Sequence, residues 1–393
     1  MALPRLAVFL AIVLAVTVAA HGFLWMRLVR DPAWPTSWRR VATIALVVLA
    51  VTMPAGFALW RIVGADAARP LSYVGATWSG VLLVFLFVLL GADALRLATR
   101  LGRRIARRPA PVDESRRRLL ARAFAGATGA GAAGLSGIAF ASAARPPAVV
   151  RVPVALAKLP PAFEGFRIVQ LTDVHVGPIL RREFLADLVA RTNALEPDLV
   201  AITGDLVDGS VEELRDVVAP LADLRARHGV FFVTGNHEYY SGAQAWLAHL
   251  PTLGVRPLCN ERVEIRRGND AIDLAGIDDA TAKGFGPPHG ADLDRALAGR
   301  DASRTVVLLA HQPRQVFDAE RLGVDLQLSG HTHGGQIAPF GLFVRLVQPV
   351  VAGLGRFGPT TLYVSRGAGS WGPPMRLANP AEITVVELTR PSA

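Results

Sequence analysis

The chain has 393 residues, of which 51% are apolar, and it carries a formal net charge of +10. The charge is uneven, because residues 1–145 hold 18 Lys+Arg against 5 Asp+Glu, whereas residues 146–393 hold 24 against 27. The basic excess therefore belongs to the N-terminal third, which argues against a nucleic-acid partner for the remainder. A single cysteine, Cys259, excludes an intrachain disulfide framework and a cysteine-rich metal site.

Three strongly apolar segments open the chain, at residues 6–28, 41–60 and 73–91. Each is long enough to cross a hydrocarbon core of about 30 Å as a helix. A fourth segment, residues 123–144, is less apolar because glycine and alanine dominate it. We therefore expect an α-helical membrane region over residues 1–145.

The arginines predict the orientation of these segments. Ten arginines lie between Arg96 and Arg122, so this loop is expected on the cytoplasmic side of the membrane. If residues 123–144 cross the bilayer, the rest of the chain lies on the extracytoplasmic side. Residues 115–144 are also similar to a twin-arginine export signal, which would be cleaved rather than span. Both alternatives export the C-terminal part, and a third leaves it in the cytoplasm.

A proline-rich stretch, residues 146–164, is typical of a linker, so we expect the folded domain over residues 165–393. In this domain apolar strand-like runs alternate with helix-like segments at about 181–195, 211–227 and 243–253. This alternation predicts an α/β fold whose sheet core is covered by helices.

Five apolar runs end at residues that bind metals or move protons. The runs are residues 166–172, 199–203, 230–234, 305–310 and 324–329. Ligands of α/β sheets bind at the carboxyl ends of strands, so we expect these polar residues to converge. The candidate metal ligands are Asp173, His175, Asp205, Asn236, His311, His331 and His333.

Seven oxygen and nitrogen ligands are too many for one tetrahedral site, but they suit two divalent metal ions that share a carboxylate. Manganese is our first expectation for both ions. Iron, zinc and nickel stay open, because selectivity among mixed oxygen and nitrogen sites depends on geometry and supply.

Two such ions would support phosphoester hydrolysis, in which a bridging hydroxide attacks phosphorus. The leaving alkoxide needs a proton, and His237 lies beside the ligand set without belonging to it, so we expect it to be the proton donor. Glu238 could orient the His237 imidazole, and Asp208 could support the loop of Asp205. Either carboxylate could equally be an ordinary solvated side chain.

The motifs Asp-x-His, Gly-Asp-x-x-Asp, Gly-Asn-His-Glu, a strand-end His and Gly-His-x-His, in this order, resemble the calcineurin-like metallophosphoesterase superfamily. The form Gly-His-Thr-His-Gly-Gly-Gln, after N-terminal membrane segments, is further similar to the bacterial membrane-associated YkuE/YaeI-type phosphoesterases. The resemblance covers about residues 165–370 and implies a four-layer α/β/β/α sandwich. It also implies the distribution of ligands: Asp205 bridges two metals, of which one is also held by Asp173, His175 and His333, and the other by Asn236, His311 and His331. In the same resemblance His237 corresponds to the catalytic histidine.

The substrate is expected to be a phosphodiester or pyrophosphate. A membrane-tethered site favours a phospholipid or a lipid-linked envelope precursor, with the bilayer as a further partner and no nucleic acid. The alternatives are a phosphomonoesterase, a nuclease, a non-catalytic metal-binding membrane module and a transporter. Binding alone needs no proton donor, so His237 argues against the binding module. The apolar segments hold few ionisable groups, mainly His21 and Asp93, which argues against transport.

Overall fold

The computed structural model describes residues 3–63, 65–106 and 113–391, and the chain divides into two compact units. The helical unit spans residues 1–141 together with 372–377. The α/β unit spans residues 142–371 and 378–393.

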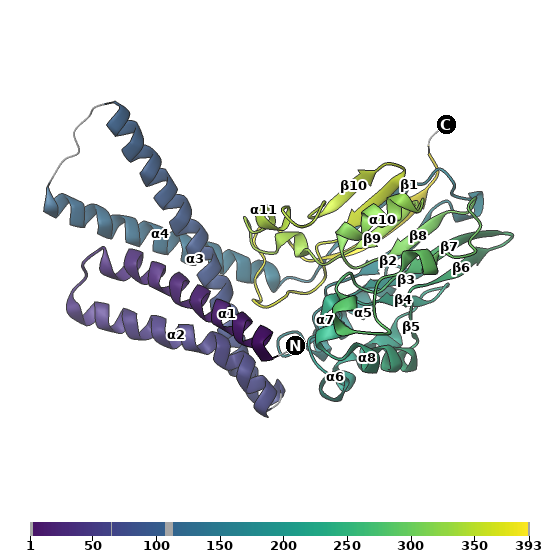
Figure 1. Ribbon diagram of the computed structural model, residues 1–393, viewed down its shortest axis with the longest axis horizontal. Coiled ribbons are helices and arrows are strands. Elements are labelled where there is room, and N and C mark those ends of the chain that lie inside the picture. Colours follow the sequence, from purple (N-terminus) through teal and green to yellow (C-terminus); the bar gives the residue numbers. More distant parts are fainter. Residues whose placement is uncertain (1–2, 64, 107–112, 392–393) are drawn as a thin grey trace. The chain divides into compact units, whose positions relative to one another are not determined.

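Long helices make up the helical unit (Figure 1): α1 (Leu3–Trp25), the π-helical turn η1 (Met26–Arg30), α2 (Thr36–Val63), α3 (Ala65–Ile105) and α4 (Glu114–Ala143). By length and composition all four α-helices could cross a membrane, as the sequence predicted. Helices α3 and α4 extend well beyond their apolar cores, because the arginine, leucine and alanine residues that flank those cores also favour helix. Residues 107–112 of the arginine-rich loop lie outside the described residues.

His21 is buried within the helical unit, and both of its ring nitrogens have partners. The Trp78 indole N–H donates to Nε2 at 2.9 Å, and Nδ1 lies 2.8 Å from the Thr17 carbonyl oxygen. Since the indole can only donate, Nδ1 must carry the ring proton and donate it to Thr17. His21 therefore links α1 to α3. Because both ring nitrogens are hydrogen-bonded within the protein, neither is left unpaired to bind a transported ion.

Two six-stranded sheets form the centre of the α/β unit. The first has the order β1-β12-β2-β3-β4-β5, with β1 (Ala148–Ala155), β2 (Phe166–Leu171), β3 (Leu199–Thr203), β4 (Val230–Val233), β5 (Val255–Pro257) and β12 (Glu382–Thr389). The second has the order β10-β11-β9-β8-β7-β6, with β6 (Glu261–Arg267), β7 (Asp270–Gly276), β8 (Val306–Leu309), β9 (Leu326–Ser329), β10 (Gly353–Phe357) and β11 (Thr360–Val364). Strands β2 to β5 run parallel, whereas β12 is antiparallel to β2 and parallel to β1.

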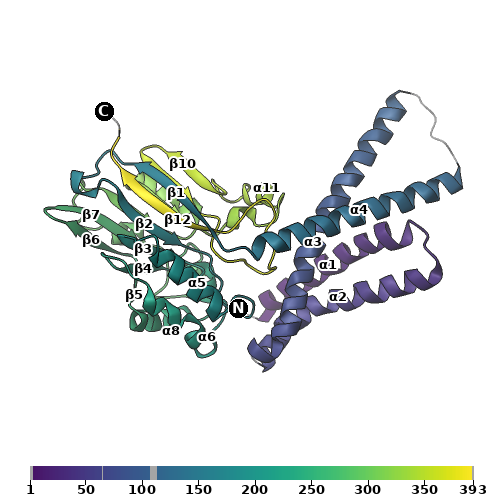
Figure 2. The ribbon, with the colours of Figure 1, turned by 180° about the vertical axis from the view of Figure 1, so that it is seen from behind.

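Short helices cover the outer faces of the two sheets (Figures 1 and 2). The first sheet is covered by α5 (Arg182–Asn193), α6 (Val211–Val218) and α8 (Ala243–His249), and the second by α9 (Leu293–Ala296) and α10 (Val316–Arg321). Two further short helices, α7 (Asn236–Tyr240) and α11 (Gly341–Val344), lie in the loops after β4 and β9. Along β3, Val200 and Ile202 pack with residues of α5, α6 and α8, whereas Leu199 and Ala201 pack with strands of the second sheet. The outer face of the second sheet packs against α9 and α10. The unit is thus the expected α/β/β/α sandwich, and both faces of its central strands are buried.

Two expectations differ from the structure in detail. The predicted linker contains β1, whose eight residues pair in register with β12, so residues 148–155 belong to the first sheet. Helix α6 ends at Val218 and continues as the 3₁₀ helix η3 (Ala219–Asp223), where Pro220 cannot donate an α-helical hydrogen bond. Helix α8 likewise gives way to the 3₁₀ helix η4 (Leu250–Leu253), which contains Pro251.

Candidate functional site

The candidate ligands come from the carboxyl ends of strands in both sheets. Asp173 and His175 follow β2, Asp205 follows β3, and Asn236 begins α7 three residues after the end of β4. His311, His331 and His333 follow β8 and β9 of the second sheet. The five strand ends therefore lie close together, as predicted. They do so at the boundary between the two sheets, called here the seam, and not along the edge of a single sheet.

Direct bonds close this seam at the site. The His331 backbone N–H lies 2.9 Å from one Asp173 carboxylate oxygen and 3.0 Å from the other. His311 Nδ1 lies 2.8 Å from the Thr203 carbonyl oxygen, and Gln170 donates to the Ser329 carbonyl oxygen at 3.0 Å. Each sheet thus fixes a ligand or a strand end of the other.

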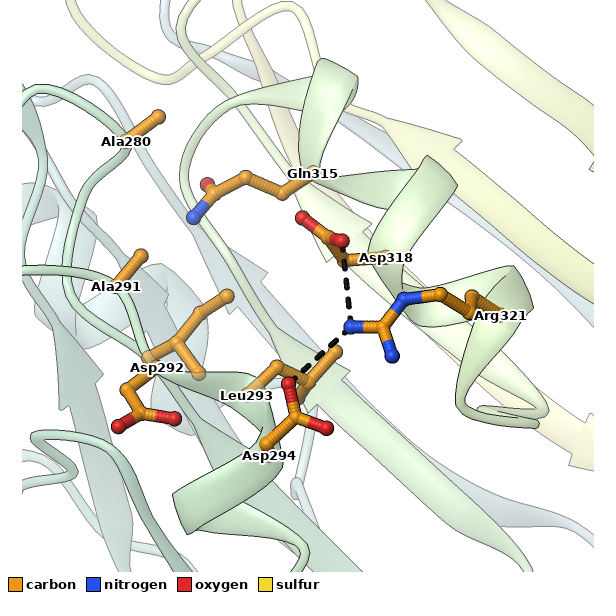
Figure 3. A pocket seen from close by; sticks show the side chains of 9 residues that line it. Ala280, Ala291, Asp292, Leu293, Asp294, Gln315, Asp318 and Arg321 are labelled. Atoms are coloured by element: carbon orange, nitrogen blue, oxygen red, sulfur yellow. Dashed lines mark hydrogen bonds and ion pairs between the residues drawn. The ribbon is translucent and has the colours of Figure 1, made fainter.

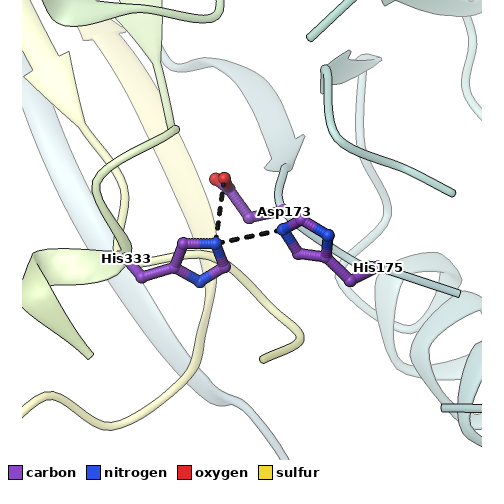
Figure 4. A group of neighbouring side chains, drawn as sticks. All are labelled: Asp173, His175 and His333. Atoms are coloured by element: carbon purple, nitrogen blue, oxygen red, sulfur yellow. Dashed lines mark hydrogen bonds and ion pairs between the residues drawn. The ribbon is translucent and has the colours of Figure 1, made fainter. Parts of the chain in front are cut away.

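Asp173, His175 and His333 form one donor group, called here the Asp173 group (Figure 4). The Nε2 atoms of His175 and His333 lie 3.1 Å apart, and His333 Nε2 lies 3.4 Å from Asp173 Oδ1. Figure 4 shows the two imidazoles directed toward one another beside the carboxylate. All three side chains are buried.

Asp205, His311 and His331 form a second group, called the Asp205 group. His311 Nε2 lies 3.1 Å from Asp205 Oδ2, and the two imidazole rings are 5.1 Å apart between centroids. The same Asp205 Oδ2 lies 3.9 Å from His175 Nε2 of the Asp173 group. One carboxylate oxygen therefore lies between the two groups.

The unsatisfied polar atoms of the site show whether metal ions suit it. Asn236 Oδ1 and His331 Nδ1 are buried and have no hydrogen-bond partner, and His311 Nε2 has only the Asp205 carboxylate, at 3.1 Å. A buried polar atom without a partner costs roughly 1–3 kcal/mol, so such atoms are rare without a ligand. Asn236, His311 and His331 offer the oxygen and nitrogen donors that divalent transition metals bind. The donor set therefore fits metal ions.

Backbone strain is concentrated at the same residues. Asp173, His175, Asp205, His331 and His333 all have φ between 50° and 70°, in the left-handed region. Side chains other than glycine rarely adopt this region, and each such residue costs about 1 kcal/mol or more. The strain turns each side chain sharply at the end of its strand and into the shared space. Sequence periodicity carries no signal for it.

Two glycines allow the close approach. A Cβ atom at Gly330 would collide with Thr172 Oγ1 and Asp173 Oδ2, and one at Gly235 would collide with the Asp205 carboxylate. Thr172 was missed by sequence reasoning, although its hydroxyl lies 2.8 Å from Asp173 Oδ2. The signal in the sequence that could have identified Thr172 is its position directly before Asp173.

Known proteins share these motifs. A family model described as "Calcineurin-like phosphoesterase" matches residues 166–335. A bovine "Transmembrane protein with metallophosphoesterase domain" is 42% identical over 317 residues, which are 77% of this chain and 70% of that protein.

This chain belongs to the calcineurin-like metallophosphoesterases.

Two bacterial metallophosphoesterases are also similar. One from Helicobacter pylori is 43% identical over 247 residues, covering 62% of this chain and 64% of that protein. YkuE of Bacillus subtilis is 31% identical over 240 residues, covering 58% of this chain and 81% of that protein. The expected family and the YkuE-type relationship are confirmed, and the fold of the family implies divalent metal ions at the two donor groups.

Asp208 of this metallophosphoesterase contacts two histidines. Its Oδ1 lies 3.0 Å from His175 Nδ1 and 2.6 Å from His237 Nδ1. Because both contacts use Nδ1, the Nε2 atom of each ring is left to face the site. His237 is less buried than the donor groups, and its ring lies between Tyr240 and Trp371, at centroid distances of 5.3 and 6.1 Å.

Glu238 is buried and supports the Asp205 loop. Its carboxylate accepts hydrogen bonds from the backbone N–H groups of Asp205 at 3.0 Å, Leu206 at 2.8 Å and Gly235 at 2.6 Å. The roles expected for the two carboxylates are therefore exchanged: Asp208 orients the His237 imidazole, and Glu238 supports the Asp205 loop. Glu238 is the third residue of α7, from where its side chain reaches back to the N-cap, Gly235. Neither is an ordinary solvated side chain.

Each donor group contains a histidine whose pKa is raised. Burial lowers the pKa of His175, but Asp208 and the other carboxylates outweigh it and raise this pKa to about 9. Burial likewise lowers the pKa of His311, but Asp205 outweighs it and raises this pKa well above its usual value. The same pairing with His311 overcomes burial at Asp205 and holds the pKa of that carboxyl well below its usual range. Burial, together with the neighbouring His311, lowers the pKa of His331 to about 4. Without metal, a proton therefore occupies each group at neutral pH, whereas His331 is neutral.

A cavity of about 270 Å³ lies elsewhere in the α/β unit (Figure 3). Figure 3 shows Arg321 at its edge, ion-paired with Asp294 and Asp318. None of the candidate ligands lines this cavity. Arg366, which lies near the motif strand ends, is ion-paired with Glu382 at 2.6 Å.

Proposed function

We propose that this membrane protein is a dinuclear metal-dependent phosphoester hydrolase, acting as a phosphodiesterase or pyrophosphatase. The observation that carries the proposal is the position of Asp205 Oδ2 between His175 and His311, with His331, whose buried Nδ1 has no partner, in the same donor group. One shared carboxylate between two donor groups is the arrangement that two-metal hydrolysis requires.

Asp173, His175, Asp205 and His333 would hold one metal ion, and Asp205, Asn236, His311 and His331 the other. When bound, two such ions lower the pKa of a coordinated water and neutralise charge on the phosphoryl oxygens. We expect manganese, with iron, zinc or nickel as alternatives. The chain's own contribution is to place these donors in advance, through the strained strand ends and the bonds across the seam.

His237 would donate the proton to the leaving oxygen. Its Nδ1 lies 2.6 Å from Asp208 Oδ1, so the carboxylate stabilises the charged imidazolium and holds the ring with Nε2 directed outward. Asp208 acts through His237 and His175 and is therefore a positioning residue. The partly exposed ring, between Tyr240 and Trp371, is open to a substrate group.

The substrate would be a phospholipid or a lipid-linked precursor of the cell envelope. Four helices able to span a membrane support this, since they keep the site beside a bilayer. The protein would lie in the bacterial cytoplasmic membrane with the α/β unit on the extracytoplasmic side, because ten arginines lie from the last turns of α3 to the first turns of α4.

The test is hydrolysis by the full chain in detergent, loaded with Mn²⁺ and given an aryl phosphodiester or an aryl phosphomonoester. We expect metal-dependent cleavage of the diester that vanishes in Asp205→Asn and falls about 10²–10³-fold in His237→Ala. Preference for the monoester would favour a phosphomonoesterase. The protein could bind two equivalents of metal and yet hydrolyse neither aryl compound, nor a phospholipid in the same micelles. That outcome would favour a non-catalytic module.

A further inference from the structure

One segment of the α/β unit exposes an unusual amount of apolar surface. Five of the exposed large apolar side chains of this unit fall within eight consecutive residues, 340–347. Leu342 is 64% exposed, Leu346 80% and Val347 69%. Single exposed apolar residues are ordinary, whereas a contiguous cluster marks a surface that binds something. We call residues 340–347 the apolar turn.

The apolar turn is held firmly at both ends. The Phe340 N–H donates to the Ile337 carbonyl oxygen at 2.9 Å, and Ile337 pairs with Ala378. At the other end Gln348 is buried and accepts a hydrogen bond from the Arg314 N–H at 3.0 Å. The apolar side chains are therefore exposed on a segment whose two ends are fixed by hydrogen bonds to the rest of the unit.

The backbone of the apolar turn satisfies its own donors. The N–H groups of residues 342–348 all bond to carbonyl oxygens three or four residues earlier, within α11 and the turns beside it. An apolar environment offers no replacement for hydrogen bonds to water, so a segment can enter lipid only when its backbone is satisfied internally. The N–H groups of the apolar turn from residue 342 onward meet this requirement.

The apolar turn also lies against the metal-ligand loop. A Cβ atom added to Gly335 would collide with the backbone of Gly341. Gly335 is the last residue of the 3₁₀ helix η7 (His333–Gly335). The Thr332 hydroxyl, between His331 and His333, donates to the Val351 carbonyl oxygen at 2.6 Å just beyond the turn. Whatever binds the apolar turn is therefore held beside the Asp173 group.

We infer that the apolar turn is a membrane-binding segment that inserts Leu342, Leu346 and Val347 into the lipid surface. The occupant is a bilayer because the chain provides one: α4 could span a membrane, and only four residues separate its end at Ala143 from β1 at Ala148. Short amphipathic helices bury their apolar face about 5–10 Å into the boundary of headgroups and acyl chains. Arg345, exposed within the turn, provides a charge for the headgroup layer.

This insertion presents the donor groups to the headgroups of membrane lipids. The substrate class is thus a phosphoester of a lipid headgroup, reached without extracting the lipid. That consequence rests on the proposed function, whereas the insertion itself does not.

The insertion can be tested without measuring activity. The full chain, with Cys259→Ser to remove its only cysteine, is given Leu346→Cys, labelled with an environment-sensitive fluorophore and reconstituted into phosphatidylcholine–phosphatidylglycerol vesicles. Phe317→Cys on α10 is the matched control, since Phe317 is also an exposed apolar residue of the α/β unit. We expect lipids with brominated acyl chains to quench the probe at 346 and to leave the probe at 317 unquenched.

Equal quenching at both positions, or none at 346, would overturn the inference. Disulfide cross-linking of two chains through Leu346→Cys, without lipid quenching, would also overturn it and assign the surface to a second copy of this chain.

Activity provides the second comparison. We expect Leu346→Asp to lower hydrolysis of phosphatidylglycerol in the vesicles about tenfold, with hydrolysis of a soluble aryl phosphodiester unchanged. Phe317→Asp should change neither rate. An equal loss on both substrates would contradict a membrane role. If the unsubstituted protein hydrolyses neither compound, the proposed function fails while the quenching result still decides the insertion.

Discussion

The two donor groups differ in how far the protein itself completes them. In the Asp173 group the polar atoms already have protein partners, since His175 contacts Asp208 and His333, and Asp173 accepts from the His331 backbone. In the Asp205 group, His311 Nε2 contacts Asp205 Oδ2 at 3.1 Å, but His331 Nδ1 is buried without a partner, as is Asn236 Oδ1. The protein itself therefore satisfies the polar atoms of the first group more fully than those of the second. The unsatisfied atoms of the second group are the ones that a cation would complete.

The largest effect is expected from Gly330→Ala, because Gly330 lies where the two sheets meet. The added methyl group would displace Thr172 and Asp173, which costs roughly 1–3 kcal/mol and moves both donor groups. We expect the bound metal to be lost and hydrolysis to fall by about 10³-fold or more. Elemental analysis and kcat/KM report the two losses. Gly284→Ala is the control, since a Cβ atom there meets nothing within 4 Å; normal metal content in Gly330→Ala would disprove the seam argument.

His331→Ala and His333→Ala distinguish the two groups. Each substitution removes a ligand from one group only, so each should release about one of two metal equivalents and lower kcat by about 10²–10³-fold. Metal content of the purified full chain measures the outcome, with His249→Ala as a control distant in sequence from the motifs. Loss of both equivalents in either variant would mean that the groups are not separable.

Glu238→Gln should weaken the Asp205 group selectively. The amide can accept through one oxygen only and turns N–H donors toward the backbone N–H groups that the carboxylate now accepts. We expect the affinity of the weaker metal to fall about 10–100-fold and the free energy of unfolding to fall by roughly 1–3 kcal/mol. Calorimetric metal titration and thermal unfolding measure both. Glu196→Gln, an exposed carboxylate, should change neither; an unaltered Glu238→Gln protein would remove Glu238 from the site.

The smallest effect is a pH dependence of metal binding that both groups share. The pKa of His175 is raised to about 9 and the pKa of His311 is raised well above its usual value, so at neutral pH a metal ion must displace a proton from each group. The pKa of His331 is lowered to about 4, so His331 adds no such cost above about pH 5. Acidification from pH 8 to pH 6 should therefore lower the metal affinity of both groups by up to about tenfold per pH unit. Calorimetry in buffers of different ionisation enthalpy counts the released protons; metal binding without proton release at either site would contradict this expectation.

The sequence predicted much of this arrangement because an apolar strand is followed by a polar candidate ligand five times, and in three of these a glycine directly precedes the ligand. It predicted which side chains would meet, since the carboxyl ends of parallel strands share an edge. It did not indicate that β8 and β9 belong to a second sheet, because a buried strand has the same apolar pattern in either sheet. The linker assignment failed for β1 because Pro146, Pro147 and Pro153 suggested an irregular chain, although Pro153 lies on an edge strand, where proline is tolerated.

The functions of Asp208 and Glu238 were exchanged for a geometric reason. Neighbours in sequence were expected to act on one another, as Glu238 on His237. On α7, however, adjacent side chains point in different directions, and the third residue of a helix reaches back toward its N-cap. The capping pattern in Gly-Asn-His-Glu was the signal that could have placed Glu238 correctly. The positive φ values of the ligands had no such signal.

The position of β12 between β1 and β2 governs the order in which the protein can be made. Strands β2 to β5 can pair as soon as they leave the ribosome, but β1 pairs only with β12, more than two hundred residues later. During that interval β1 follows directly behind α4 as an unpaired strand, and unpaired edges invite aggregation. The strand β1 therefore stays without a partner until residues 382–389 are synthesised, and a chain truncated before them would leave β1 unattached to the sheet.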